Sequence, residues 1–111
     1  MNIKTNPLIL KEQSKGVCTL KFDRPNTRNP LSLAMMRELS KQLQTIQNDP
    51  SIKVVVITGS GSAFCSGHDL KELQSTSSGL MIFSSCSNLM MQIIRLKKPV
   101  IAQVNGAAAA A

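Results

Sequence analysis

The 111-residue sequence contains no tryptophan, no tyrosine and a single histidine, His68. Three phenylalanines are its only aromatic residues, which leaves little to stack against nucleic-acid bases. Six acidic residues stand against 13 basic ones, and the net charge of +7 suits anionic partners such as nucleic acid, acidic lipid or phosphate-bearing small molecules. Because the basic residues are scattered and the aromatic residues are few, we expect no nucleic-acid partner.

Cysteines and long apolar runs are also scarce. Cys18, Cys65 and Cys86 are odd in number and widely spaced, which argues against a disulfide framework and for a reducing compartment. Cys65 and His68 have the spacing of half a metal site, but no second pair lies near them in the sequence, so we expect no metal. No apolar run approaches the roughly 20 residues that span a bilayer, and residues 1–7 resemble no targeting peptide. We therefore expect no membrane span, and the sequence shows no recognisable targeting signal.

The length and the 42% hydrophobic content are those of one globular domain. Residues 8–13 and 17–23 predict two antiparallel strands joined by a turn at Gly16. Residues 24–30 contain two prolines and predict a loop. The loop carries Arg24 and Arg28, which either contact a phosphate group or lie on the surface as ordinary solvated side chains.

Two long helices are predicted, over residues 31–48 and 80–96. Apolar residues recur at three- and four-residue steps in the first, which begins with a cap at Asn29 or at Ser32. Residues 69–73 predict a short helix, and the Ser/Thr-rich residues 74–79 predict a mobile linker. Lys97 and Lys98 follow the second long helix, where cations favour the helix dipole.

Two further strands, over residues 52–58 and 100–104, run into small residues. The continuous apolar run in the first predicts an internal parallel strand that is covered on both faces. The second leads into Asn105, Gly106 and an alanine run that we interpret as a turn towards another helix. Alternating strands and helices predict an α/β fold, and ligands of such folds bind outside the carboxyl ends of the strands.

These two strand exits are a source of free backbone N–H groups, because amides at a strand exit or helix start lack internal partners. Two such donors aimed at one carbonyl oxygen stabilise the charge that develops when the carbonyl is attacked or enolised. Nucleophilic catalysis is the alternative. Neither Ser62 nor Ser66 stands in a Gly-x-Ser-x-Gly elbow, whereas Cys65 activated by His68 is compatible with the composition.

Four sequence blocks carry a resemblance to a known family. They are Arg24-Pro25-x-x-x-Asn29-x-Leu31, Val54-Val55-Val56-Ile57-Thr58-Gly59, Phe64-Cys65-Ser66-Gly67-His68-Asp69-Leu70 and Lys98-Pro99-Val100-Ile101-Ala102-x-Val104-Asn105-Gly106. In this order and spacing they resemble the enoyl-CoA hydratase/isomerase (crotonase) superfamily, and most of all its mitochondrial domain-containing proteins of the third type. The resemblance implies a ββα spiral that binds acyl-CoA thioesters without another cofactor. It also implies a homotrimer or hexamer and a mitochondrial location, with the cytoplasm as the alternative because no transit peptide is visible.

The resemblance also assigns site residues. The family's two oxyanion-hole amides fall on His68 and Ala111, where the family has a small residue and a glycine triplet, respectively. Cys65, Ser66 and Gly67 would line the adenine and pantetheine path of coenzyme A. Arg28 would meet a phosphate group, since a guanidinium binds phosphate through paired hydrogen bonds.

The acid/base glutamates of the family follow the second oxyanion amide, and neither Glu38 nor Glu72 matches their positions. We therefore expect residues 1–111 to be the N-terminal part of a crotonase-like domain. The whole would be a hydratase-like lyase of fatty acid metabolism or a non-catalytic acyl-CoA binder. A third expectation is an inactive fragment that does not fold alone, since internal parallel strands need neighbours.

Overall fold

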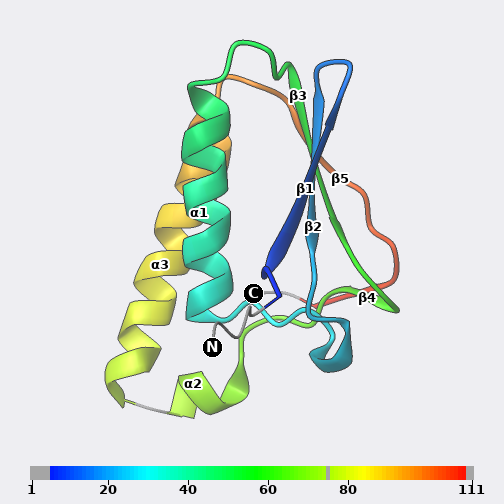
Figure 1. Cartoon of the computed structure of the whole chain (residues 1–111). Coiled ribbons are helices and arrows are strands. Elements are labelled where there is room, and N and C mark those ends of the chain that lie inside the picture. The colour runs from blue at the N-terminus through cyan, green and yellow to red at the C-terminus, as the bar shows by residue number, and fades with distance from the viewer. Residues whose placement is uncertain (1–5, 75, 110–111) are drawn as a thin grey trace, which may run out of the picture.

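The computed structural model describes residues 6–74 and 76–109 as a four-stranded sheet with two long helices on one face, beside a small second sheet (Figure 1). The strands of the larger sheet lie in the order β1-β2-β3-β5. Their bounds are Ile9–Ser14 for β1, Val17–Phe22 for β2, Val54–Gly59 for β3 and Val100–Ala102 for β5. This arrangement confirms the predicted α/β class.

The first two strands form the predicted hairpin. β1 and β2 pair antiparallel, with Ser14 opposite Val17. Lys15 and Gly16 between them have φ values of 51° and 81°, and a two-residue turn with positive φ at both positions matches the twist of the flanking strands. Cys18, Leu20 and Phe22 of β2 are buried, so one face of the hairpin contributes to the core.

β3 is internal and parallel to both of its neighbours, β2 and β5, as predicted. The expectation that both of its faces are covered was wrong. Val55 and Ile57 are buried, whereas the alternate residues Val54 and Val56 are only half-buried. The helices α1 (Leu33–Gln47) and α3 (Thr76–Arg95) lie together on one face of the sheet, so Val55 and Ile57 are more fully enclosed than Val54 and Val56 (Figure 1).

α1 has the predicted apolar stripe, and its cap decides between the two expected residues. The Ser32 hydroxyl accepts a hydrogen bond from the Met35 amide at 3.1 Å, so Ser32 caps the helix and Asn29 does not. The stripe enters the core through Met35, Met36, Leu39, Leu43 and Ile46.

The predicted linker over residues 74–79 was wrong. The short helix α2 spans Leu70–Gln74 and α3 already begins at Thr76, while residue 75 lies outside the described residues. Serine and threonine are weak helix formers, but α3 places Ile82 and Leu89 in the core against α1. Tertiary packing of an amphipathic face overrides such weak propensities.

Of the helices in the described residues, none is long and apolar enough to cross a membrane.

Lys98 follows α3 in the sequence, but its side chain binds to the end of α1. Its Nζ donates hydrogen bonds to the carbonyl groups of Ile46 and Asp49, at the C-terminal end of α1. The Ile46 carbonyl lies in the last turn of α1 and the Asp49 carbonyl lies just after the cap, so a cation there favours the C-terminal end of the helix dipole. The lysine therefore connects the start of β5 to the end of α1.

A second small sheet was not predicted. β4 (Ala63–Cys65) and β6 (Ala107–Ala108) pair parallel to each other beyond the ends of β3 and β5. The alanines after Gly106 thus begin as a strand, and not as the helix expected there. The loop predicted at residues 24–30 contains a 3₁₀ turn, η1, at Pro25–Thr27.

Candidate functional site

The pairing of β4 with β6 brings the two strand exits together. Cys65 is in register with Ala108, and the Ala109 amide donates to the Cys65 carbonyl at 2.9 Å. His68 lies three residues after Cys65, and Ala111 lies three residues after Ala108. Because the strands are parallel, their chains leave on the same side. Ala111 lies outside the described residues, so its predicted oxyanion role stays a prediction.

The His68 amide is aimed by a contact of the residue before it. The Gly67 carbonyl accepts a hydrogen bond from the Leu31 amide at 2.7 Å. Gly67 and His68 share a trans peptide, in which the N–H group points away from the C=O group. The His68 amide therefore points away from Leu31, and it has no acceptor among the described residues. Gly67 has a φ of 88°, a backbone conformation that glycine adopts without strain.

Asn29 holds the loop before α1 against the loop after β3. It is buried, with a φ of 53°, and its Nδ2 donates to the carbonyls of Ser60 and Ala63 at 3.0 and 2.9 Å. Its Oδ1 accepts from the Arg24 amide at 2.7 Å. Asparagine tolerates this left-handed conformation better than most residues. The asparagine of the first family-like block is thus a structural link between the two loops.

Asn105, which follows β5, makes a similar set of contacts with the loop after β3. Its Oδ1 accepts from the Gly59 amide at 3.0 Å and its Nδ2 donates to the Gly61 carbonyl at 3.1 Å. The next residue, Gly106, packs so closely that a Cβ atom there would lie 2.0 Å from the Ser62 carbonyl oxygen. Asn105 and Gly106 therefore fix the approach of the two loops that carry β4 and β6.

A groove of about 610 Å³ lies beside the His68 loop, and we call it the polar groove because charged and hydroxyl side chains stand in its wall beside apolar ones. Its basic side chains are Arg24 and Lys71, and Asp69 is its acidic one. The residues that line it come from the N-terminal segment, the η1 loop and the His68 loop: Leu8, Arg24, Thr27, Pro30, Ser32, Ser66, His68, Asp69, Leu70 and Lys71. Of the residues predicted to meet coenzyme A, Ser66 therefore lies in the groove wall.

The two arginines of the η1 loop are placed differently. The Arg24 guanidinium donates to the carbonyls of Asn6, Pro7 and Asp23, and so anchors the N-terminal segment along the groove. Arg28 is exposed, has a φ of 62° and does not line the groove. Its predicted contact with a phosphate group stays a prediction.

Cys65 and His68 do not form a catalytic pair in the described structure. The Cys65 thiol is buried, and its Sγ accepts from the Gly67 amide at 3.4 Å. The His68 ring instead packs edge-on against Phe83 of α3, with centroids 6.3 Å apart and an interplanar angle of 78°. Residues 6–74 and 76–109 contain no group of three His, Cys, Asp or Glu side chains that could hold a metal ion.

Glu72 and Glu38 both accept hydrogen bonds from groups of α1. The Glu72 carboxylate accepts from the Leu33 amide at 3.0 Å and so caps α1 from a neighbouring element. The Glu38 carboxylate accepts from the Gln42 amide group at 3.1 Å, one helical turn along α1. Neither contact is directed at the β4 and β6 exits.

An apolar cavity of about 350 Å³ lies behind these exits. It is bounded by Phe64 and Cys65 of β4, by Ala108 and Ala109, and by the sheet and both long helices. The remaining lining residues are Phe22, Leu31, Leu39, Ile57, Leu89, Met90, Ile93, Val100 and Ala102. Cys65, predicted to line the coenzyme A path, therefore faces an apolar space on the core side of β4.

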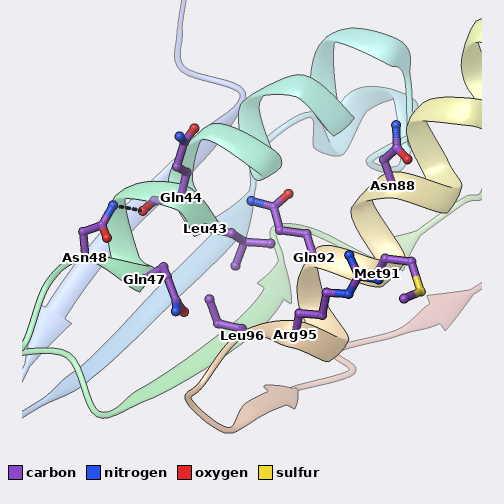
Figure 2. Close-up of a pocket in the computed structure, with 9 residues that line it drawn as sticks. All are labelled: Leu43, Gln44, Gln47, Asn48, Asn88, Met91, Gln92, Arg95 and Leu96. Carbon is purple, nitrogen blue, oxygen red and sulfur yellow. Dashed lines mark hydrogen bonds between the residues drawn. The ribbon is translucent and has the colours of Figure 1, made fainter.

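A second groove of about 580 Å³ lies between the C-terminal halves of α1 and α3 (Figure 2). Figure 2 shows Gln44, Gln47 and Asn48 on the α1 side, opposite Gln92 and Arg95 of α3. Three of its amide side chains, those of Gln47, Asn48 and Gln92, have hydrogen-bond partners within the chain. Gln92 bonds twice with Ser40, Asn48 donates to the Gln44 carbonyl, and Gln47 accepts from the Lys97 amide. The Gln92 contacts join α3 to α1, and the Gln47 contact joins α1 to the segment after α3.

Comparison with known proteins identifies the family. The chain matches the enoyl-CoA hydratase/isomerase family over residues 12–111. It belongs to this family. It is 41% identical, over all of its length, to the mitochondrial enoyl-CoA hydratase domain-containing protein 3 of Danio rerio. It is 33% identical over 93% of its length to the 1,2-epoxyphenylacetyl-CoA isomerase of Escherichia coli.

Solved structures of this family share the fold. The crystal structure of human enoyl-CoA hydratase domain-containing protein 3 matches 90% of the chain with a TM-score of 0.85 and 37% identity. An enoyl-CoA hydratase of Mycobacterium smegmatis matches 89% of it with a TM-score of 0.83 and 42% identity. The chain spans 39% of the Danio rerio relative and 41% of the human structure. The predicted crotonase-like fold is thereby confirmed for this portion of the family domain.

Proposed function

We propose that the chain supplies the acyl-CoA-binding, oxyanion-hole part of an enoyl-CoA hydratase-like lyase. The observation that carries the proposal is the β4–β6 register, which pairs Cys65 with Ala108, each three residues before His68 and Ala111 in the sequence. The aimed and unpartnered His68 amide is one donor, and the Ala111 amide is the other. Both would bind the thioester carbonyl oxygen.

The chemistry of hydration explains why two amides are needed there. When water adds to C3 of an enoyl thioester, the electron pair of the double bond moves onto the carbonyl oxygen as an enolate. A proton then reaches C2, and the oxygen and one proton of water remain at C3. Each donor aimed at the enolate oxygen lowers the barrier by about 3 kcal/mol. The proton-transfer groups would come from another part of the family domain, because Glu38 and Glu72 are engaged elsewhere.

Coenzyme A would lie along the polar groove. Ser66 lines it, and Cys65 and Gly67 are its neighbours in the sequence, whose backbone would lie along the coenzyme A path. Arg24 and Lys71 supply positive charge for the phosphates, and Arg28 would approach them from the exposed side of η1. The acyl chain would leave the oxyanion site on the α3 side. No metal or other cofactor enters this proposal, with coenzyme A present as part of the substrate.

A non-catalytic acyl-CoA binder is the second candidate, because an oxyanion amide and a groove for coenzyme A would bind a thioester without any proton-transfer group. The two functions are separated by testing a protein of family length that carries this chain. Calorimetry with butyryl-CoA, competed by free CoA, measures binding, and hydration of crotonyl-CoA measures catalysis. Binding with hydration supports the lyase, binding alone supports the second candidate, and no binding at millimolar ester contradicts both.

Mitochondrial location and a trimeric or hexameric assembly are part of the proposal. The location is supported by the mitochondrial names of the Danio rerio and human relatives, with the cytoplasm as the alternative. Fractionation of cells that express the tagged protein tests the location. Light scattering coupled to gel filtration tests the assembly, and a monomer at micromolar concentration would contradict it.

A further inference from the structure

The His68 side chain has a feature that the oxyanion role of its amide does not use. Its Nδ1 is buried and has no hydrogen-bond partner, the one such side-chain nitrogen or oxygen atom among the described residues. A buried polar atom without a partner costs about 1–3 kcal/mol. The ring is held in this position by its edge-on contact with Phe83, and it also lines the polar groove.

This placement selects one form of the imidazole. Neutral imidazole has one N–H donor and one acceptor nitrogen. A proton on Nδ1 would be a buried donor without an acceptor, whereas a proton on Nε2 leaves only a lone pair at Nδ1. The charged groups that line the groove with the ring are Arg24, Asp69 and Lys71, and none of them bonds to it. The Nε2–H tautomer is therefore the form that fits, with its donor free for a ligand.

We propose that the His68 imidazole is a specificity-determining hydrogen-bond donor that selects acyl-CoA esters with an oxygen on C3. This inference rests on the proposed function, in which the amide of the same residue holds the thioester oxygen. Within one residue, Nε2 lies only about 5 Å from the backbone nitrogen by ordinary bond lengths. Its donor can therefore reach ligand atoms a few ångströms from the thioester carbonyl, and a C3 oxygen lies within that range.

The test compares two esters that differ by that oxygen. Binding of butyryl-CoA and 3-hydroxybutyryl-CoA to the family-length protein is measured by calorimetry. We expect the wild type to prefer the 3-hydroxy ester by roughly tenfold, the effect of one well-placed hydrogen bond. His68→Phe keeps an aromatic ring against Phe83 but removes the donor, and we expect its preference to fall to about one. His68→Gln restores a side-chain donor and should recover part of the preference.

The outcomes separate this inference from the function on which it rests. If neither ester binds to a folded wild-type protein, the proposed function fails. If both esters bind with equal affinity to the wild type, acyl-CoA binding stands and the role of the imidazole is overturned. A preference that survives in His68→Phe also overturns it, because packing alone would then explain the selectivity. Circular dichroism of each variant confirms that it is folded.

Discussion

The Leu31 amide donates a hydrogen bond to the Gly67 carbonyl at 2.7 Å, and this contact sets the direction of the His68 amide. Leu31 lies just before α1, and Gly67 lies just after β4. A contact between the two therefore ties the start of a helix to a strand exit more than thirty residues away. The donor proposed to stabilise the enolate is directed by backbone geometry and needs no particular side chain.

Asn29 should be the most sensitive polar residue of this scaffold. Asn29→Ala removes the bonds that Asn29 donates to the carbonyls of Ser60 and Ala63, and the Ala63 carbonyl keeps a longer bond from Asn105 Nδ2 at 3.3 Å. We expect the free energy of unfolding to fall by about 3 kcal/mol, since lost networks of buried hydrogen bonds give the larger mutational effects. Urea unfolding measures it. The matched control is Asn26→Ala, an exposed residue of η1, with an expected change within about 0.5 kcal/mol.

Gly106 and Gly79 should respond in opposite directions to alanine. A Cβ atom at Gly106 would lie 2.0 Å from the Ser62 carbonyl oxygen, so Gly106→Ala must push the β4 and β6 loops apart. Gly79 lies within α3, where a Cβ atom would meet its nearest neighbour at an ordinary 3.4 Å. Gly79→Ala should therefore increase the free energy of unfolding by up to about 1 kcal/mol, and raise the melting temperature accordingly. Thermal melts followed by circular dichroism compare the two, and a neutral Gly106→Ala would contradict the packing described.

Asp49 should make stability depend on acid pH. Hydrogen bonds from the Ser51 hydroxyl and amide lower the pKa of the Asp49 carboxyl from its ordinary 3.8. A lowered folded-state pKa stabilises the protein above the unfolded pKa, and that contribution disappears as the pH falls through the folded value. Asp49→Asn should thus be less stable than the wild type at pH 7, and the difference should shrink below pH 3.8. Unfolding free energies across this range test it, and a constant difference would contradict it.

Lys71 should contribute to coenzyme A affinity through charge. It lines the polar groove, whereas Lys41 is an exposed residue of α1 outside the groove lining. We expect Lys71→Ala to weaken CoA binding about fivefold at low ionic strength and less in high salt, where screening is stronger. Lys41→Ala removes the same charge at a distance from the groove. Equal losses in the two variants would mean that net charge alone attracts the ligand.

The parts of the fold that follow local rules could be predicted from the sequence. Positive-φ residues Lys15 and Gly16 make the hairpin turn, and the apolar run of β3 marks an internal strand. Spaced apolar residues similarly reveal α1. In each case the interactions that decide the structure lie within a few residues of one another.

The parts that depend on distant contacts could not be predicted in this way. β4 and β6 are three and two residues long, composed mostly of small residues, and each exists only because the other pairs with it. The start of α3 depends on its packing against α1, and Lys98 bonds to a helix end about fifty residues before it. The family-like sequence blocks indicate the site residues, while the contact that directs the His68 amide is visible only in three dimensions.

The most direct measurement compares butyryl-CoA binding by a family-length wild-type protein and its His68→Pro variant. Proline at this position removes the backbone N–H group proposed to hold the thioester oxygen. We expect the affinity to fall at least about tenfold, as a lost hydrogen bond to a carbonyl in a dry site predicts. Circular dichroism verifies that the variant is folded. Equal affinity of the two folded proteins would contradict the account, because the His68 amide would then hold no part of the ligand.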